Sequence, residues 1–126
     1  MKKYILILIC LLSLNLFSQD CILCNKKDLI DIGATYHETT EDGNILYIKR
    51  LEYGYWMYSY NSQRDVVLVQ LLNITEKVYV LAMAEILNEN KVKVSSNQWL
   101  DYIAGLPVSI DLKFDNGYYF LYSITK

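Results

Sequence analysis

The stretch Tyr53–Asn73, which reads YGYWMYSYNSQRDVVLVQLLN, decides the fold. Its first eight residues are mostly aromatic, and residues 66–72 are mostly valine and leucine. Aromatic and β-branched residues favour strands, and the polar segment Asn61–Asp65 between the two runs is typical of a hairpin turn. We therefore predict that the two runs are neighbouring strands at the centre of an antiparallel sheet.

Alternation along the first run divides its side chains between two faces of the sheet. Trp56, Tyr58 and Tyr60 fall on one face, whereas Tyr55 falls on the other with Met57 and Ser59. If one face fills the core, the second presents its side chains to solvent or to a helix. The aromatic residues of this run and of the last predicted strand are the candidate binding residues, namely Tyr53, Tyr55, Trp56, Tyr58, Tyr60 and Tyr119.

Tyrosine is the residue type that stands out, with 12 copies in 126 residues. Tyrosine and tryptophan combine a large contact area with a polar group, so they are common anchors at binding surfaces. The alternative interpretation is that tyrosine populates the strands of small exported domains without any binding role.

The residues before this stretch predict a further hairpin. Residues 28–36 alternate between apolar and polar side chains, as in a half-buried strand, although the spacing of Leu29, Ile32 and Tyr36 also fits a helix. The segment Asp42–Asn44 is typical of a tight turn. We therefore expect residues 28–38 to pair with residues 45–51.

Gly54 interrupts the apolar run from Ile45 to Tyr60. It indicates either a short turn near Leu51–Tyr53 or a bulge within one long, bent strand.

The residues after the central stretch predict a helix over residues 75–88. They are rich in alanine, methionine, leucine and glutamate, which favour helices, and Asn73–Glu76 offers an N-terminal cap. A strand over Val78–Val80, followed by a hairpin turn at Asn88–Lys91, is the alternative interpretation. In the helix, four apolar residues share the face that we expect to be buried: Val78, Leu81, Ala82 and Ile86.

A short second helix is predicted over Asn97–Ala104, because Gly105 and Pro107 follow it as helix-stopping residues do. Its inward side chains would be Trp99, Leu100, Tyr102 and Ile103.

The C-terminal residues predict the clearest hairpin in the chain. Residues 108–114 and 118–124 alternate or are rich in aromatic residues, and Asp115–Gly117 between them is typical of a turn. We expect Val108, Ile110, Leu112 and Phe114 to face the core, and Ser109, Asp111 and Lys113 to face outward.

Together these elements predict an α+β fold. It consists of an antiparallel sheet of five to seven hairpin-joined strands, with one or two helices packed on one face. A small closed β-barrel is the alternative. The chain has 126 residues, of which 53% are apolar and 21% are charged, and this composition suits one small folded domain.

Residues 1–18 have the layout of a secretory signal peptide. Lys2 and Lys3 precede the apolar run Tyr4–Leu12, and the small residue Ser18 stands at the expected cleavage position. We therefore expect residues 19–126 to be the mature domain, exported to the periplasm or the exterior and without stable membrane insertion.

Two other fates of the N-terminal segment are considered. A retained membrane anchor needs about 20 apolar residues, and Ser13 and Asn15 interrupt this run. Lipid attachment at Cys21 is the other, although the acidic residue Asp20 directly before it does not fit a lipid-attachment signal.

Cys21 and Cys24 remain after cleavage, and we expect them to form a disulfide because the exported environment is oxidising. A redox site or a metal site is the alternative for a Cys-x-x-Cys pair. A zinc site needs four ligands, and the chain has no second cysteine pair. Asn25 occupies the position where covalent haem attachment needs histidine.

The charge of the chain argues against a nucleic-acid partner. Loss of Lys2 and Lys3 takes 12 basic residues to 10 against 14 acidic ones, so the mature net charge is −4. A phosphate backbone requires a basic face instead.

The sequence offers little catalytic chemistry. His37 is the single histidine, a candidate base or metal ligand beside Glu38, or else a solvated residue near a polar turn. Glu85 and Glu89 lie one helical turn apart, as on a solvated face, and Asp111 is expected on the outward face of its strand. We predict no catalytic residues, no metal site and no cofactor.

Two functions follow from these patterns. The first is a small exported, non-catalytic binding protein, similar in role to an inhibitor or an immunity protein, with a protein partner on its aromatic sheet surface. The second is a small-molecule-binding or hydrolytic envelope protein with a pocket near His37. Thiol redox work by Cys21 and Cys24 is a third interpretation.

Overall fold

The computed structural model describes residues 21–114 and 117–124, so the expected signal segment 1–18 lies outside the described residues. So do Asp115 and Asn116 of the expected C-terminal turn. The described elements, in chain order, are α2 (Lys26–Asp31), β1 (Thr35–Thr39), β2 (Ile45–Leu51), β3 (Gly54–Asn61), β4 (Val66–Ile74), α3 (Lys77–Asn90), β5 (Val92–Ser95), β6 (Gln98–Ile103), β7 (Leu106–Phe114) and β8 (Tyr118–Ile124).

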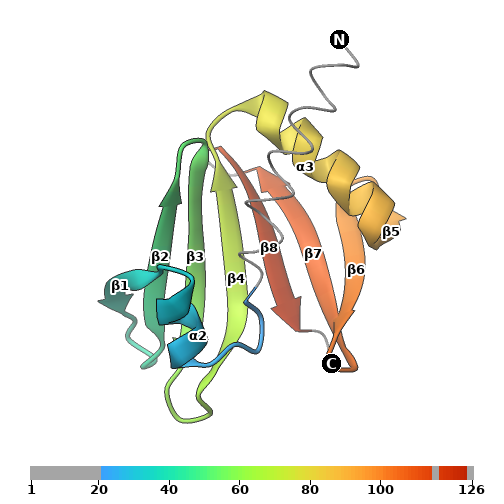
Figure 1. Cartoon of the computed structure of the whole chain (residues 1–126). Coiled ribbons are helices and arrows are strands. Elements are labelled where there is room, and N and C mark those ends of the chain that lie inside the picture. Colours follow the sequence, from blue (N-terminus) through green and yellow to red (C-terminus); the bar gives the residue numbers. More distant parts are fainter. Residues whose placement is uncertain (1–20, 115–116, 125–126) are drawn as a thin grey trace.

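The strands of the described chain form one antiparallel sheet of eight strands in the order β1-β2-β3-β4-β8-β7-β6-β5. Each half of the chain contributes a helix followed by four consecutive strands, and the two halves meet where β4 pairs with β8 (Figure 1). The predicted α+β fold is confirmed, with slightly more strands than expected. The sheet stays open between its edge strands β1 and β5, so it is not a barrel.

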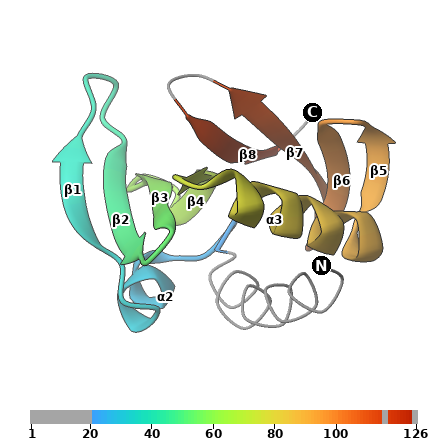
Figure 2. The ribbon, with the colours of Figure 1, turned by 90° about the horizontal axis from the view of Figure 1, so that it is seen from above.

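Helices α2 and α3 lie on the same side of the sheet (Figure 2). The core fills the space between this side of the sheet and the helices. On β3, Trp56, Tyr58 and Tyr60 are buried whereas the residues between them are half-buried, which confirms the predicted division of this strand into two faces. The largest fully buried side chains come from both halves of the chain: Trp56, Trp99, Tyr58, Phe120, Leu29, Leu72, Ile74, Met83, Ile86 and Leu87.

The strand predicted from residue 28 is wrong in its first part, where the chain forms α2. Asn25 caps this helix: its Oδ1 accepts a hydrogen bond from the Asp28 backbone N–H (2.9 Å), and Asp28 Oδ2 accepts one from the Asn25 N–H (3.2 Å). This reciprocal cap satisfies two backbone donors that a helix start leaves without partners. The strand begins only at Thr35, after Gly33 has turned the chain with a φ of +90°.

The helix predicted over Asn97–Ala104 is also wrong, because β6 occupies these residues and pairs with β5 and β7. Ala104 and Gly105 both have positive φ (53° and 80°), and Ile103 pairs with Leu106 around them. Two such residues form the hairpin turn that matches strand twist. Gly105 therefore turns a hairpin instead of ending a helix.

The strand pattern changes which side chains of this segment are buried. Trp99 is buried as predicted, whereas Tyr102, expected to point inward, is 62% exposed. Two residues of β7 also differ from expectation. Phe114, expected in the core, is 60% exposed, and Ser109 is buried although it lies on the same face of β7 as Asp111, as predicted.

The helix predicted over residues 75–88 is confirmed as α3, but it presents a different face to the core. Asn73 belongs to β4, and the residue at the N-terminal cap is Glu76, whose side chain makes no capping hydrogen bond. Val78 and Leu81, predicted to be buried, are 45% and 58% exposed. The buried residues of α3 are Val80, Ala82, Met83, Ile86 and Leu87.

Gly54 follows a short turn that separates β2 from β3, so the turn interpretation of this region is correct. A Cβ atom at this position would lie 1.8 Å from the backbone oxygen of Asn73 on β4. Only glycine allows the two strands to approach this closely.

Candidate functional site

The six aromatic residues predicted to bind a partner occupy two different environments. Trp56, Tyr58, Tyr60 and Tyr53 belong to the buried core. Tyr55 and Tyr119 are half-buried and lie outside that core cluster.

The buried aromatic residues pack against one another and against α3. The Trp56 and Tyr58 rings stack with their centroids 6.1 Å apart, and Tyr53 stacks on Tyr79 of α3 at 4.9 Å. Burial raises the pKa of Tyr53 to about 12, with a smaller contribution from Tyr79.

Tyr55 and Tyr119 lie on the face of the sheet opposite α2 and α3, which we call the open face. No described helix covers it (Figure 2). Directly opposed residues of antiparallel strands share a face, so the strand registers define which side chains lie together on the open face.

The first feature of the open face is an aliphatic row across four adjacent strands. Ile48 pairs with Met57, Met57 with Leu71, and Leu71 with Leu121. Ile48 is 8% exposed, and the other three side chains are half-buried. The row continues to Asp111 of β7, which pairs with Leu121.

Asp111 is held by its own strand. The Ser109 hydroxyl donates a hydrogen bond to Asp111 Oδ2 at 3.3 Å, and Gln98 Nε2 donates one to Ser109 Oγ at 3.1 Å. The aliphatic row therefore ends at β7 beside a polar network formed by Gln98, Ser109 and Asp111.

The second feature is a parallel row, which we call the tyrosine row. Arg50 pairs with Tyr55, and Tyr55 with Asn73. Asn73 pairs with Tyr119, and Tyr119 with Lys113. Arg50 and Lys113 are exposed, and the three residues between them are half-buried.

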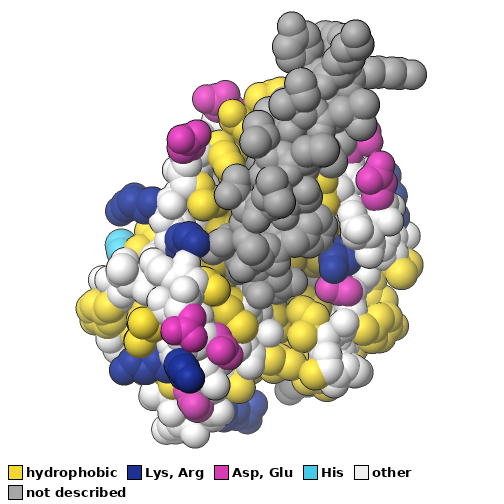
Figure 3. Space-filling model, in the orientation of Figure 1, with side chains coloured by type: hydrophobic (Ala, Val, Ile, Leu, Met, Phe, Trp, Pro, Cys, Tyr) yellow, Lys and Arg dark blue, Asp and Glu magenta, His cyan; other side chains and the backbone are white. Residues whose placement is uncertain are grey.

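The helical side of the molecule has a different surface. Where Figure 3 shows the described residues of this side, basic and acidic side chains are interspersed among apolar ones.

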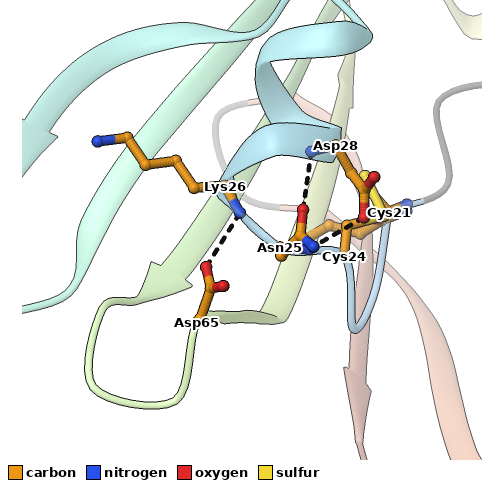
Figure 4. The surroundings of a disulfide bond; sticks show 7 residues. Cys21, Cys24, Asn25, Lys26, Asp28 and Asp65 are labelled. Atoms are coloured by element: carbon orange, nitrogen blue, oxygen red, sulfur yellow. Dashed lines mark hydrogen bonds between the residues drawn. A yellow bond between two sulfur atoms is a disulfide. The ribbon is translucent and has the colours of Figure 1, made fainter.

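Cys21 and Cys24 form the expected disulfide, which closes the short loop that leads into α2 (Figure 4). Cys21 is buried, and its backbone N–H donates a hydrogen bond to Gln70 Oε1 at 2.8 Å. The Leu23 N–H donates to the Val67 carbonyl (2.8 Å), and the Val67 N–H donates to the Cys24 carbonyl (2.9 Å). These contacts give the pair a structural role.

Asp65, in the turn between β3 and β4, makes a second attachment of α2. Its Oδ1 accepts a hydrogen bond from the Lys26 backbone N–H (Figure 4). The same oxygen accepts a hydrogen bond from the Tyr60 hydroxyl. The bond to Asp65 raises the pKa of Tyr60 to about 12. The same bond, followed by that from Lys26, lowers the pKa of Asp65.

His37 lies on the edge strand β1, where it is exposed, with its Nε2 3.9 Å from Glu38 Oε1. A cavity of about 550 Å³ lies at the turn between β2 and β3, and Arg50, Leu51, Glu52 and Tyr53 line it. In residues 21–114 and 117–124, no group of three or more His, Cys, Asp or Glu side chains is placed to hold a metal ion.

No protein-family model, curated protein or solved structure matches the chain. Neither helix in the described part of the chain has the length and apolar character needed to cross a lipid bilayer.

Sequence reasoning singled out Tyr55 and Tyr119 as candidates but not the residues beside them. Ile48, Leu71 and Leu121 come from three strands and look unremarkable in each one. The signal that could have found them is alternation combined with strand register. Met57 was already assigned to the face opposite Trp56, and its register partners extend that face.

Proposed function

We propose that the protein is an exported, non-catalytic binding protein that holds a protein partner on the open face of its sheet, in the manner of an inhibitor or an immunity protein. The observation that carries this proposal is the aliphatic row Ile48–Met57–Leu71–Leu121, which lies on a face without a described helix. When a partner removes apolar side chains in such a position from water, the free energy falls, and this stabilises the complex.

The position of the row suits a binding surface. Three inter-strand steps of about 4.8 Å give it a length of roughly 14 Å. Its strands β3, β4 and β8 are paired on both sides, so the backbone is held in place before a partner arrives. A preorganised surface loses little conformational entropy on binding.

The two tyrosines beside the row supply contacts of a second kind. Tyr55 and Tyr119 pair with Asn73 on either side of it and present hydroxyl groups next to the aliphatic side chains. We assign partner contact to these two residues. The buried residues Trp56, Tyr58 and Tyr60 support the same strands from the core side.

A protein partner suits this surface better than a small molecule. Small ligands bind in concave pockets that enclose most of their surface, and the rows extend across five strands. The N-terminal sequence and the disulfide support a partner in the envelope or outside the cell.

The test is affinity capture of proteins from the native envelope fraction with the tagged, exported protein. Leu121→Ala combined with Tyr119→Ala on the open face should abolish capture of the partner. Leu81→Ala combined with Val78→Ala is the matched control, because it removes exposed apolar side chains from α3 on the helical side. The midpoint of thermal unfolding should remain similar for both variants. Equal capture of the same proteins by both variants would refute the proposal.

A further inference from the structure

We propose that the partner contacts the open face through an acidic segment that lies along the tyrosine row, from Arg50 to Lys113. This inference rests on the proposed function and specifies the chemistry of the same surface. It is carried by a different observation, namely the hydrogen-bonding character and charge of the row.

Every side chain of the tyrosine row can donate hydrogen bonds. Arginine and lysine donate only, and the tyrosine hydroxyl and the asparagine amide can each donate. Within the described part of the chain, none of the five takes part in a side-chain hydrogen bond or an ion pair: Arg50, Tyr55, Asn73, Tyr119 and Lys113. A row of donors is complementary to carboxylates, which only accept.

The charge of the row contrasts with that of the chain. The whole chain has a net charge of −2, yet both ends of the row are basic and exposed. The ion pairs among the described residues join His37 to Glu38 and Lys91 to Asp101, so Arg50 and Lys113 are available to an acidic partner.

The dimensions of the row fit a short extended segment. Four inter-strand steps of about 4.8 Å separate Arg50 from Lys113, or roughly 19 Å. An extended chain advances about 3.3 Å per residue, so about six residues span the row. Acids at both ends of such a segment would meet Arg50 and Lys113, and the tyrosine hydroxyls would bond to the groups between them.

Asp111, an acid of the open face, indicates over which row the acids of the segment lie. Asp111 lies two residues from Lys113 on the same face of β7 and ends the aliphatic row. A carboxylate over the aliphatic row would meet this like charge, whereas one over the tyrosine row would meet Lys113. The partner is therefore expected to place apolar side chains on the aliphatic row and acids on the tyrosine row.

The first test measures binding of a synthetic peptide by fluorescence anisotropy. The probe is a labelled ten-residue peptide of alternating glutamate and leucine, and its counterpart has glutamine in place of every glutamate. We expect the acidic peptide to bind the purified protein, and Arg50→Gln or Lys113→Gln to weaken binding by about three- to tenfold each. The matched controls are Lys27→Gln and Lys93→Gln, which remove exposed charges elsewhere and should leave the affinity unchanged.

Equal binding of the two peptides, or equal effects of the row variants and the controls, would overturn the inference. A sulfated polysaccharide such as heparin that binds through the same residues more tightly than the acidic peptide would also overturn it, because the occupant would then be a polyanionic glycan.

The second test separates this inference from the proposed function. In the envelope capture, Arg50→Gln combined with Lys113→Gln should lose the partner that Leu121→Ala combined with Tyr119→Ala also loses. If the charge variant retains that partner and the open-face variant loses it, the proposed function stands and the acidic segment is refuted. If neither variant loses the partner, both are refuted.

Discussion

The two halves of the molecule have the same element order, a helix followed by four strands, but they hold their helices by different means. In the N-terminal half, α2 has six residues and buries only Leu29. In the C-terminal half, α3 has 14 residues, buries five of them and makes no side-chain cap. The start of the short helix is constrained by the Cys21–Cys24 disulfide and by its own cap, and Asp65 bonds it to the turn between β3 and β4.

This difference shows how helix length determines the kind of attachment that is needed. Isolated helices shorter than about 12 residues are marginal in water, and α2 has too little apolar surface to compensate. The disulfide therefore closes the loop ahead of α2, and hydrogen bonds to Gln70 and Val67 fix that loop to β4. α3 gains most of its stability from apolar burial, supplemented by the hydrogen bond from Trp99 Nε1 to Asn88 Oδ1 at 2.8 Å.

The largest expected effect concerns apolar burial by α3. Leu87→Ala should lower the free energy of unfolding by about 2–5 kcal/mol, because Leu87 is completely buried and the substitution leaves a cavity. Leu81→Ala on the same helix is the control and should cost less than about 0.5 kcal/mol, because Leu81 is exposed. Urea denaturation measures both. Similar losses for the two variants would contradict the burial pattern of α3.

The next effect concerns the disulfide of the N-terminal half. Cys21→Ala combined with Cys24→Ala should lower the free energy of unfolding by about 2 kcal/mol, because the bridge closes a loop of only four residues. Hydrogen exchange should accelerate at the amides of α2 and Val67, and should stay unchanged at the buried turns of α3. If hydrogen exchange accelerated equally in α2 and α3, the disulfide would stabilise the whole domain and not the α2 region alone.

A smaller effect compares the two buried tryptophans. Trp99 Nε1 donates to Asn88, whereas Trp56 Nε1 is buried without a hydrogen-bond partner in the described structure. Trp99→Phe should therefore cost about 1 kcal/mol more than Trp56→Phe, the usual net value of one hydrogen bond. Thermal or urea unfolding of the two variants gives the difference. The opposite order would indicate that Trp56 is the better anchored of the two.

The smallest effect concerns the pH dependence of the Asp65 contact. The lowered pKa of Asp65 means that its carboxylate stabilises the fold above the unfolded pKa of about 3.9, and that this contribution is lost as the pH falls through the folded value. Asp65→Asn should lose stability relative to the native protein at pH 7 and should converge with it in acid. Asp31→Asn controls for loss of an exposed charge on the same half and should show no such convergence.

The hydrogen bond between Tyr60 and Asp65 also predicts a pH dependence of stability at alkaline pH. The pKa of Tyr60 is raised to about 12, so the neutral phenol stabilises the fold below pH 10 or so, and this contribution is lost as the pH rises toward 12. Tyr60→Phe should remove that alkaline loss from a stability profile followed by circular dichroism. An unchanged profile would mean that another group is responsible.

The sequence predicted the elements whose local pattern agrees with their tertiary role. The hairpins over residues 53–73 and 108–124 and the helix α3 were correct because alternation and helix propensity are strong there. The prediction for α2 was wrong because residues 28–31 also fit the alternation of a strand. The helix is started by the cap between Asn25 and Asp28, and Asn25 lies ahead of the segment that was read as a strand. Gly105 was misread because a glycine after apolar residues marks either a helix end or a hairpin turn, and only the pairing of β6 with β7 decides.

The candidate site was predictable only in part. Composition made Tyr55 and Tyr119 candidates, and the division of β3 into two faces followed from alternation. Arg50 and Lys113 could not be joined to them, because their common row depends on four strand registers across residues distant in the sequence. Burial of Trp56, Tyr58 and Tyr60 likewise depends on which side of the sheet the helices cover.

The position of β8 has a consequence for folding. It is the last of the described strands, yet it lies in the interior of the sheet between β4 and β7. A polypeptide that ends before Tyr118 would not lose a border of the protein. It would be split into a four-stranded and a three-stranded ribbon, each with a bare inner margin that is prone to aggregate. The eight-stranded sheet is therefore complete only when β8 has paired with both β4 and β7.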